Sequence, residues 1–207
     1  MHWNSNSINK ASQLIEELEQ FIHTNSIDII SINETKLNSS DQISIKNYNI
    51  IRKDRNSHGW GVAIIIHEEL NYEQIDTFEE FDLELITIKV IINKLNYTFI
   101  TLYLPPQAQL PNNELFENLI LCGDLNCKSK LWFLKQKNQN GILLEKILLS
   151  KNLSVVKNKK LTHYWKLTNK LDILDIIITS PNINKQIINL QIPQNENVIK
   201  MFHVLNS

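Results

Sequence analysis

The chain has 207 residues, of which 43% are hydrophobic and 21% are charged, values that fit a soluble globular protein. A length of 207 residues fits one domain, and no second domain is required. The net charge of −1 gives no overall signal for nucleic acid, no signal peptide opens the chain, and no apolar run approaches the roughly 20 residues that span a bilayer.

The hydrophobic pattern predicts the following elements in chain order. Apolar residues at helical spacing predict an amphipathic helix over 9–24. Strands are predicted at 27–32, 49–51, 62–67, 83–92 and 97–102, the last two joined as a hairpin at 94–96. A short helix at 113–119, a helix at 141–150 and strands at 153–156, 173–179 and 187–192 complete the list. Strands mixed with a few long helices favour two packed sheets with helices outside.

The motif Gly123-Asp124-Leu125-Asn126 directly follows the apolar run at 119–122. If the extended backbone continues, Asp124 and Asn126 lie on one face, because strand side chains alternate with a period of two. One acid and one amide would then point at the same place. The alternative is a plain buried strand that ends in a turn.

Several other short segments follow one another along the chain in an order that is typical of one group of proteins. They are Asn4-Ser5-Asn6-Ser7-Ile8, Asn33-Glu34-Thr35-Lys36, Gly59-Trp60-Gly61-Val62-Ala63-Ile64, Tyr103-Leu104-Pro105-Pro106, Leu131-Trp132, Asn138-Gln139-Asn140-Gly141, Leu161-Thr162-His163-Tyr164 and Leu174-Asp175-Ile176-Ile177-Ile178. With the Asp-x-Asn motif, this series resembles the endonuclease/exonuclease/phosphatase superfamily, most closely the endonuclease domain of LINE-type (non-LTR) retrotransposons. The resemblance covers nearly the whole chain and implies a four-layer α/β sandwich.

The resemblance also implies metal ligands. Glu34 resembles the family's magnesium ligand, and Asn6 resembles the asparagine near that metal, preferred here to Asn4, whose alternative role is to cap a turn. Mg²⁺, or Mn²⁺ in its place, suits such a site because hard cations bind carboxylate and water oxygens. Without the other motifs, Glu34 would be read as a solvated loop residue.

The resemblance implies roles at the site for five further residues, four of them catalytic and one, Thr162, in DNA binding. Asp124 resembles the general base, Asn126 the amide that positions the scissile phosphate, and Tyr103 the tyrosine whose hydroxyl reaches that phosphate. Asp175 resembles the acid that orients a catalytic histidine and keeps it protonated. Thr162 resembles a threonine on the DNA side of the site, and its alternative is a strand residue.

The chain departs from the family at its end and at two other places. The family closes with Ser-Asp-His, whereas this chain has Met201-Phe202-His203, so a phenyl ring stands where an acid is expected and His203 is either catalytic or structural. Few residues precede Asn4 to form a first strand, and the segment between 106 and 123 is short. We therefore expect one domain over 1–207, truncated at its N-terminus and shortened internally.

Lysines concentrate in the C-terminal half. Residues 124–170 hold eleven lysines against Asp124 and Glu145, whereas 73–84 is acidic. Such a segment can neutralise a phosphate backbone, and Lys128 and Lys130 are its candidate DNA contacts. A solvated surface is the alternative. Cys122 and Cys127 match no disulfide or zinc spacing and suit a reducing compartment.

Three function classes follow. The first is a Mg²⁺-dependent endonuclease that nicks one DNA strand, the second is a phosphatase of the same superfamily, and the third is an inactive relic with residual DNA binding. For the first, we expect a soluble, intracellular monomer that acts in the nucleus, with DNA as partner and a reverse transcriptase fused to it in the family.

Overall fold

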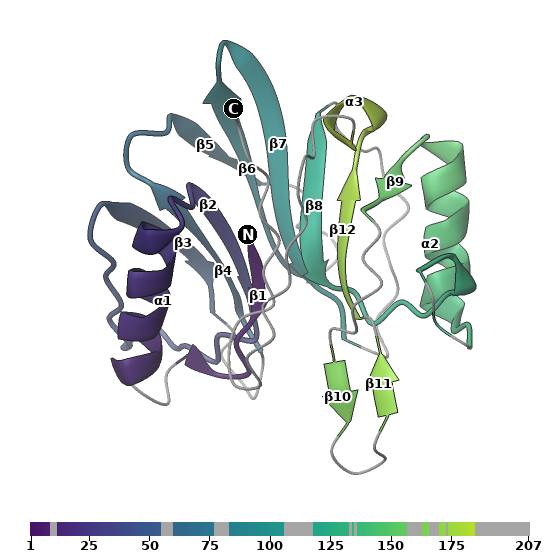
Figure 1. Cartoon of the computed structure of the whole chain (residues 1–207), viewed down its shortest axis with the longest axis horizontal. Helices are drawn as coiled ribbons and strands as arrows, with labels where there is room; N and C mark the ends of the chain where they lie inside the picture. The colour runs from purple at the N-terminus through teal and green to yellow at the C-terminus, as the bar shows by residue number, and fades with distance from the viewer. Residues whose placement is uncertain are drawn as a thin grey trace.

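The fold is given by a computed structural model, shown in Figure 1. It describes residues 1–184 apart from gaps at 9–11, 55–59, 77–82, 106–117, 133, 135, 157–162, 166–169 and 173.

The first sheet has four strands in the order β1-β2-β4-β3. These are β1 (His2–Asn4), β2 (Ile29–Asn33), β3 (Tyr48–Lys53) and β4 (Val62–His67). The pair β1–β2 is parallel and the other two pairs are antiparallel. Helix α1 (Ser12–Thr24) covers the outer face, where its Leu18 and Ile22 are buried in one cluster with Ile30 and Ile32 of β2.

The second sheet has six strands in the order β5-β6-β7-β8-β12-β9. These are β5 (Tyr72–Ile75), β6 (Glu84–Ile92), β7 (Leu95–Tyr103), β8 (Leu119–Asp124), β12 (Asp175–Thr179) and β9 (Ser154–Val155). Only β7–β8 is parallel within it. Helix α2 (Gln139–Ser150) covers its outer face and begins at Asn138, whose side chain accepts from the Gly141 N–H. A hairpin of β10 (His163–Trp165) and β11 (Lys170–Asp172) and the short helices η3 (Lys130–Trp132) and α3 (Pro181–Asn184) complete the described elements.

The inner faces of the two sheets pack on each other. Val62, Ile64 and Ile66 of β4 share a buried cluster with Ile88 of β6 and Phe99 of β7. Helix, sheet, sheet and helix therefore form four layers, and the predicted α/β sandwich is confirmed.

Most predicted elements coincide with observed ones, and the differences are local. Strand β4 has the predicted bounds, and α1 and α2 match the two long predicted helices. The hairpin between β6 and β7 turns at Asn93 and Lys94, both at positive φ (49° and 66°), one position before the predicted turn. A first strand, β1, does form despite its three residues, because β2 offers it a parallel edge. The helix predicted at 113–119 cannot include Leu119, because Leu119 is the first residue of β8. The strand predicted at 187–192 lies outside the described residues.

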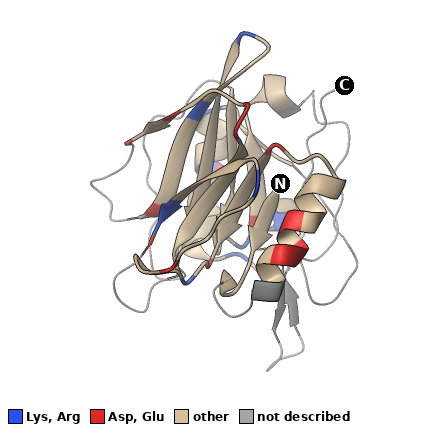
Figure 2. Ribbon diagram, turned by 90° about the vertical axis from the view of Figure 1, so that its left-hand side faces the viewer, with Lys and Arg blue, Asp and Glu red and all other residues tan. Residues whose placement is uncertain are grey.

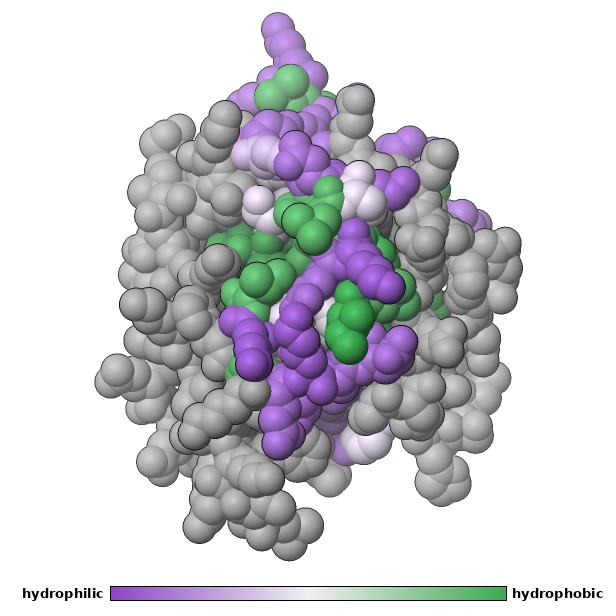
Figure 3. Space-filling view, turned by 90° about the vertical axis from the view of Figure 1, so that its right-hand side faces the viewer, coloured by the Kyte–Doolittle hydropathy of each residue, from purple (hydrophilic) through white to green (hydrophobic). Residues whose placement is uncertain are grey.

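The surface of the described part is uneven in charge and hydropathy. Figure 2 marks acidic residues along the ribbon of α1, which carries Glu16, Glu17 and Glu19. Figure 3 shows hydrophobic side chains set among hydrophilic ones on the opposite side of the molecule, and Leu149 of α2 is 82% exposed. Among the described helices, none combines the length and the apolar character needed to cross a membrane.

Candidate active site at the strand ends

The candidate site lies where strands of both sheets end. Asn4 is the last residue of β1, Glu34 follows β2, Tyr103 closes β7, Asp124 closes β8 and Asp175 opens the antiparallel β12. Parallel strands end at the same edge of a sheet, and an antiparallel neighbour begins there. The topology therefore brings together side chains that are far apart in the sequence.

Asn4 connects the two sheets at this edge. Its Nδ2 donates to Glu34 Oε1 at 2.9 Å and to Asp124 Oδ2 at 3.2 Å. One amide nitrogen thus holds two carboxylates, one from each sheet. Because this nitrogen donates to both, the two negative charges share a polarised N–H₂ group instead of facing each other directly.

The preference for Asn6 over Asn4 is not supported by this geometry. Asn6 is exposed, and its Oδ1 accepts from Lys36 Nζ at 2.9 Å. The physical reason lies in the backbone, which leaves the strand after Asn4 and takes a positive φ of 46° at Asn6. Strand alternation therefore stops before Asn6, and Asn4 rather than Asn6 is the residue against Glu34.

The loops after β1 and β2 are tied to each other, which fixes Glu34. The carbonyl of Glu34 accepts from the Ser7 N–H at 2.8 Å and from Ser5 Oγ at 3.0 Å, and Thr35 N–H donates to Gly61 O at 3.2 Å. Glu34 itself has a φ of 57°, a conformation that non-glycine residues adopt at some cost and that is concentrated at functional sites. The surrounding hydrogen bonds offset that cost.

Asp124 is buried and held from two sides. Its Oδ2 accepts from Asn4 and its Oδ1 accepts from the backbone N–H of Asn126 at 3.1 Å. The predicted shared face of Asp124 and Asn126 is wrong, because β8 ends at Asp124 and Asn126 has a φ of 46°. The Asn126 amide turns to the carbonyl of Leu104 at 2.9 Å, so its described contact with Asp124 is through the backbone.

Gly123 is needed because β7 passes too close for a side chain. A Cβ built on Gly123 would lie 1.8 Å from the carbonyl oxygen of Leu102. The neighbouring bond from Leu104 N–H to Asp124 O, at 2.9 Å, fixes β8 at this distance from β7. The glycine of the Gly-Asp-Leu-Asn motif thus sets the position of the acid that follows it.

Tyr103 is buried beside three carboxylates. Burial, followed by the negative charges of Glu34, Asp124 and Glu84, raises the pKa of Tyr103 well above its ordinary value. The phenol therefore stays protonated at neutral pH and can donate a hydrogen bond. Its neighbour Trp60 lies with its ring centroid 6.1 Å away.

Asp175 lies directly opposite Asp124 in the β8–β12 pair. The bond from Leu125 N–H to Leu174 O makes that neighbouring pair the hydrogen-bonded one, so Asp124 and Asp175 form a close, non-hydrogen-bonded pair on one face. Asp175 Oδ1 lies 3.2 Å from Nε2 of His2, a buried residue of β1.

The oxygens of the site fit a divalent cation of the kind the sequence predicts. Mg²⁺ is typically bound by one or two carboxylates together with water, and Glu34 and Asp124 present carboxylates on either side of Asn4. No group of three or more His, Cys, Asp or Glu residues clusters as a metal site in the described ranges.

The remaining predicted residues follow β8 in the sequence or lie outside the described residues. Lys128 and Lys130 follow β8 in the loop before α2, with Lys130 exposed. Thr162 and His203 fall outside the described residues. Cys122 and Cys127 are both free and buried, and burial raises the pKa of each thiol to about 12.

Sequence reasoning missed three residues next to the site. His2 precedes Asn4 by two positions, a spacing that would place both on one face of a strand. Glu84 is the cross-strand partner of Tyr103, and its Oε2 accepts from the Gly61 N–H at 2.7 Å. Trp60, whose ring centroid lies 4.5 Å from Lys36 Nζ, belongs to the segment Gly59–Ile64, and the sequence did not indicate that it lies next to the site.

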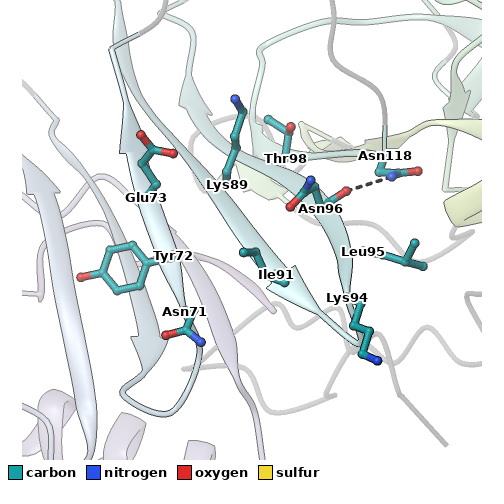
Figure 4. A pocket seen from close by; sticks show the side chains of 10 residues that line it. All are labelled: Asn71, Tyr72, Glu73, Lys89, Ile91, Lys94, Leu95, Asn96, Thr98 and Asn118. Carbon is teal, nitrogen blue, oxygen red and sulfur yellow. Dashed lines mark hydrogen bonds between the residues drawn. The ribbon is translucent and has the colours of Figure 1, made fainter.

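A separate hollow lies at the hairpin end of the second sheet. It is lined by residues of β5, β6 and β7, with Lys89, Ile91 and Asn96 among them, and Figure 4 shows the bond from Asn118 Nδ2 to the Asn96 carbonyl beside it. Asn96 lies at the start of β7 and Tyr103 at its end. At about 3.3 Å per residue, this part of the hollow is roughly 20 Å from Tyr103 and the carboxylates beside it. It is therefore not part of the candidate active site.

Comparison with known proteins agrees with the resemblance seen in the sequence. A family described as endonuclease-reverse transcriptase matches residues 97–198. A probable RNA-directed DNA polymerase from transposon BS of Drosophila melanogaster is 23% identical over 141 residues. That alignment covers 63% of this chain and 15% of the relative, so the chain spans a small part of that protein's length.

Solved structures share the fold. The endonuclease domain of TRAS1, a telomere-specific non-LTR retrotransposon, superposes with a TM-score of 0.72 at 14% identity, covering 96% of this chain and 93% of that one. An AP endonuclease from Archaeoglobus fulgidus gives a TM-score of 0.60 at 14% identity over 91% and 88% of the two chains. Both likenesses show that the chain has the same fold as these two structures.

Proposed function

We propose that the chain is a divalent-metal-dependent DNA endonuclease that nicks one strand, because it matches a family described as endonuclease-reverse transcriptase and shares the fold of a non-LTR retrotransposon endonuclease domain. One observation carries the proposal: strand ends from both sheets bring the carboxylates of Glu34 and Asp124 to the single amide nitrogen of Asn4. We further propose the nucleus as its place of action, and the match to a transposon RNA-directed DNA polymerase supports a reverse transcriptase as its fused partner.

The chemistry follows from the residues in place. Asp124, oriented by Asn4 and by the Asn126 N–H, would accept the proton of the attacking water. Tyr103, kept protonated, would donate to a phosphate oxygen. A bound divalent cation would supply charge that stabilises the phosphoryl oxygens, and Glu34 would hold it. Asn126 shapes the loop after β8 through its bond to Leu104 O.

The first experiment is nicking of supercoiled plasmid with and without Mg²⁺. Asp124→Ala should lower the rate about 10²- to 10⁴-fold, the usual cost of losing a general base. Glu34→Gln should raise the Mg²⁺ concentration needed for half-maximal nicking. Glu69→Gln is the matched control, since that carboxylate is 85% exposed and lies in another loop. Unchanged nicking in both site variants would remove these residues from the site.

The second experiment tests the DNA partner. Neutralising Lys128 and Lys130 should weaken binding to all sequences and flatten its salt dependence, because released counterions dominate backbone contacts. Lys89→Gln, on the far end of the second sheet, is the control. Binding that does not respond to salt in fluorescence anisotropy would count against a phosphate-backbone contact. Release of phosphate from inositol phosphates, without nicking, would favour the phosphatase.

A specific observation also favours a second candidate, an inactive relic that still binds DNA. Phe202 stands where the resembled family has an acid beside its histidine. A phenyl ring can neither hold a water nor accept a proton. Salt-dependent DNA binding by the purified chain, with no Mg²⁺-dependent nicking, would select this candidate.

A further inference from the structure

A buried chain of polar side chains connects the two sheets behind the candidate site. Thr101 Oγ1 lies 2.5 Å from Ser31 Oγ, Ser31 Oγ lies 3.0 Å from His2 Nδ1, and His2 Nε2 lies 3.2 Å from Asp175 Oδ1. The residues belong to β7, β2, β1 and β12 in that order. All four are buried. This series of side-chain contacts therefore runs from Thr101 in the second sheet through Ser31 and His2 in the first sheet and back to Asp175 in the second sheet.

The direction of the hydrogen bonds follows from which groups can donate. An ionised Asp175 only accepts, so the proton between it and His2 is on Nε2. With a neutral ring, Nδ1 carries a lone pair and accepts from the Ser31 hydroxyl. The Ser31 oxygen can then accept from the Thr101 hydroxyl. Each hydroxyl uses its one proton once, so with an ionised Asp175 and a neutral ring these contacts fit the Nε2–H tautomer of His2.

The position of Asp175 explains why such a chain matters to the site. Asp175 and Asp124 are a close cross-strand pair, and two carboxylates at that spacing repel each other. His2 draws Oδ1 of Asp175 toward β1, and Asn4, two residues along the same strand face, draws Oδ2 of Asp124. One short strand thus holds both acids of the β8–β12 pair from the same side.

We propose that His2 is a positioning residue that fixes the orientation of the Asp175 carboxylate through its Nε2–H. This inference rests on the proposed function for its effect on nicking. The competing explanation is a core histidine whose ring only fills space between the sheets. The two explanations differ in whether a donor at the place of Nε2 is needed.

Two substitutions separate the nitrogens. The amide of His2→Gln can reach the place of Nε2 and so keep a donor on Asp175, whereas that of His2→Asn can reach the place of Nδ1 and keep only a partner for Ser31. Both remove the ring, so both should reduce stability to urea to a similar degree. If His2 positions Asp175, Gln should retain most of the nicking rate, while Asn should lose about 10- to 100-fold, the range for residues that orient a site ligand.

The experiment measures plasmid nicking, urea unfolding and the His2 tautomer by ¹H–¹⁵N long-range NMR, with His2→Gln used to assign the His2 signals. Support is nicking in the order parent, Gln, Asn at similar stabilities, with the Nε2–H tautomer in the parent. Equal losses in both variants, or an Nδ1–H tautomer, would overturn the inference. If the parent does not nick, the proposed function fails, and the tautomer alone decides: Nε2–H supports the positioning contact and Nδ1–H refutes it.

Discussion

Replacing Asn4 with alanine should destabilise the protein far more than removing the side chain of Asn6. Asn4 donates two hydrogen bonds to carboxylates, at 2.9 Å and 3.2 Å. A hydrogen bond to a charged group contributes about 1.5–3 kcal/mol, and because this position is partly buried we take the lower value for each bond. The free energy of unfolding should therefore fall by about 3 kcal/mol.

The matched control is Asn6→Gly, because Asn6 is exposed, has a φ of 46° that glycine tolerates, and keeps one contact with Lys36. Its effect should stay within about 0.5 kcal/mol. The assay is urea unfolding of both variants in buffer containing a chelator, followed by tryptophan fluorescence. Equal unfolding free energies for Asn4→Ala and Asn6→Gly would refute the assignment of Asn4 as the link between Glu34 and Asp124.

Three more outcomes are expected. Gly123→Ala should push β8 away from the Leu102 carbonyl, which lies 1.8 Å from the new Cβ, and lower the unfolding free energy by about 3 kcal/mol or more; a crystal structure with β7 and β8 unmoved would contradict this. Because the pKa of Tyr103 is raised on folding, its contribution to stability is present below pH 10 and is lost above it, by about 1.4 kcal/mol per pH unit. Unfolding measured between pH 9 and 11 should therefore change less steeply in Tyr103→Phe than in the parent, and identical slopes would count against the shift. Restoring the family motif with Met201→Ser and Phe202→Asp should increase Mg²⁺-dependent plasmid nicking, and no increase would show that Phe202 does not limit the rate.

Much of the fold could be predicted because apolar runs and turn residues are local signals. The strand β4 and the helix α2 follow directly from such runs. The hairpin turn was predicted one position too late, because Lys94 takes a positive φ where a glycine would normally mark the turn. Asn93, which tolerates positive φ, was the available signal. Strand β1 has three residues, too few for any periodicity, and exists because β2 provides its partner.

The site was harder to predict, because it depends on where each strand stops. The sequence indicated Glu34 and Asp124, each next to a long apolar run, and the structure brings both to Asn4. It could not show that extended backbone ends at Asp124, so strand alternation wrongly placed the Asn126 side chain on the same face as Asp124. The preference for Asn6 came from its position in the resembled motif, which does not show where β1 ends. His2 was missed because only the long-range packing of β1 against β8 and β12 gives it a partner.

Because the site is divided between two sheets, its geometry depends on how the sheets pack against each other. Asn4 and Glu34 lie in and directly after strands of the first sheet. Tyr103, Asp124 and Asp175 lie in strands of the second sheet. The apolar layer between the sheets therefore sets the relative position of the two groups. Each sheet could keep its own hydrogen-bonded ladder while the layer between them loosens. On gentle heating, activity should then disappear before far-ultraviolet circular dichroism changes, so that loss of function reports the separation of two intact halves.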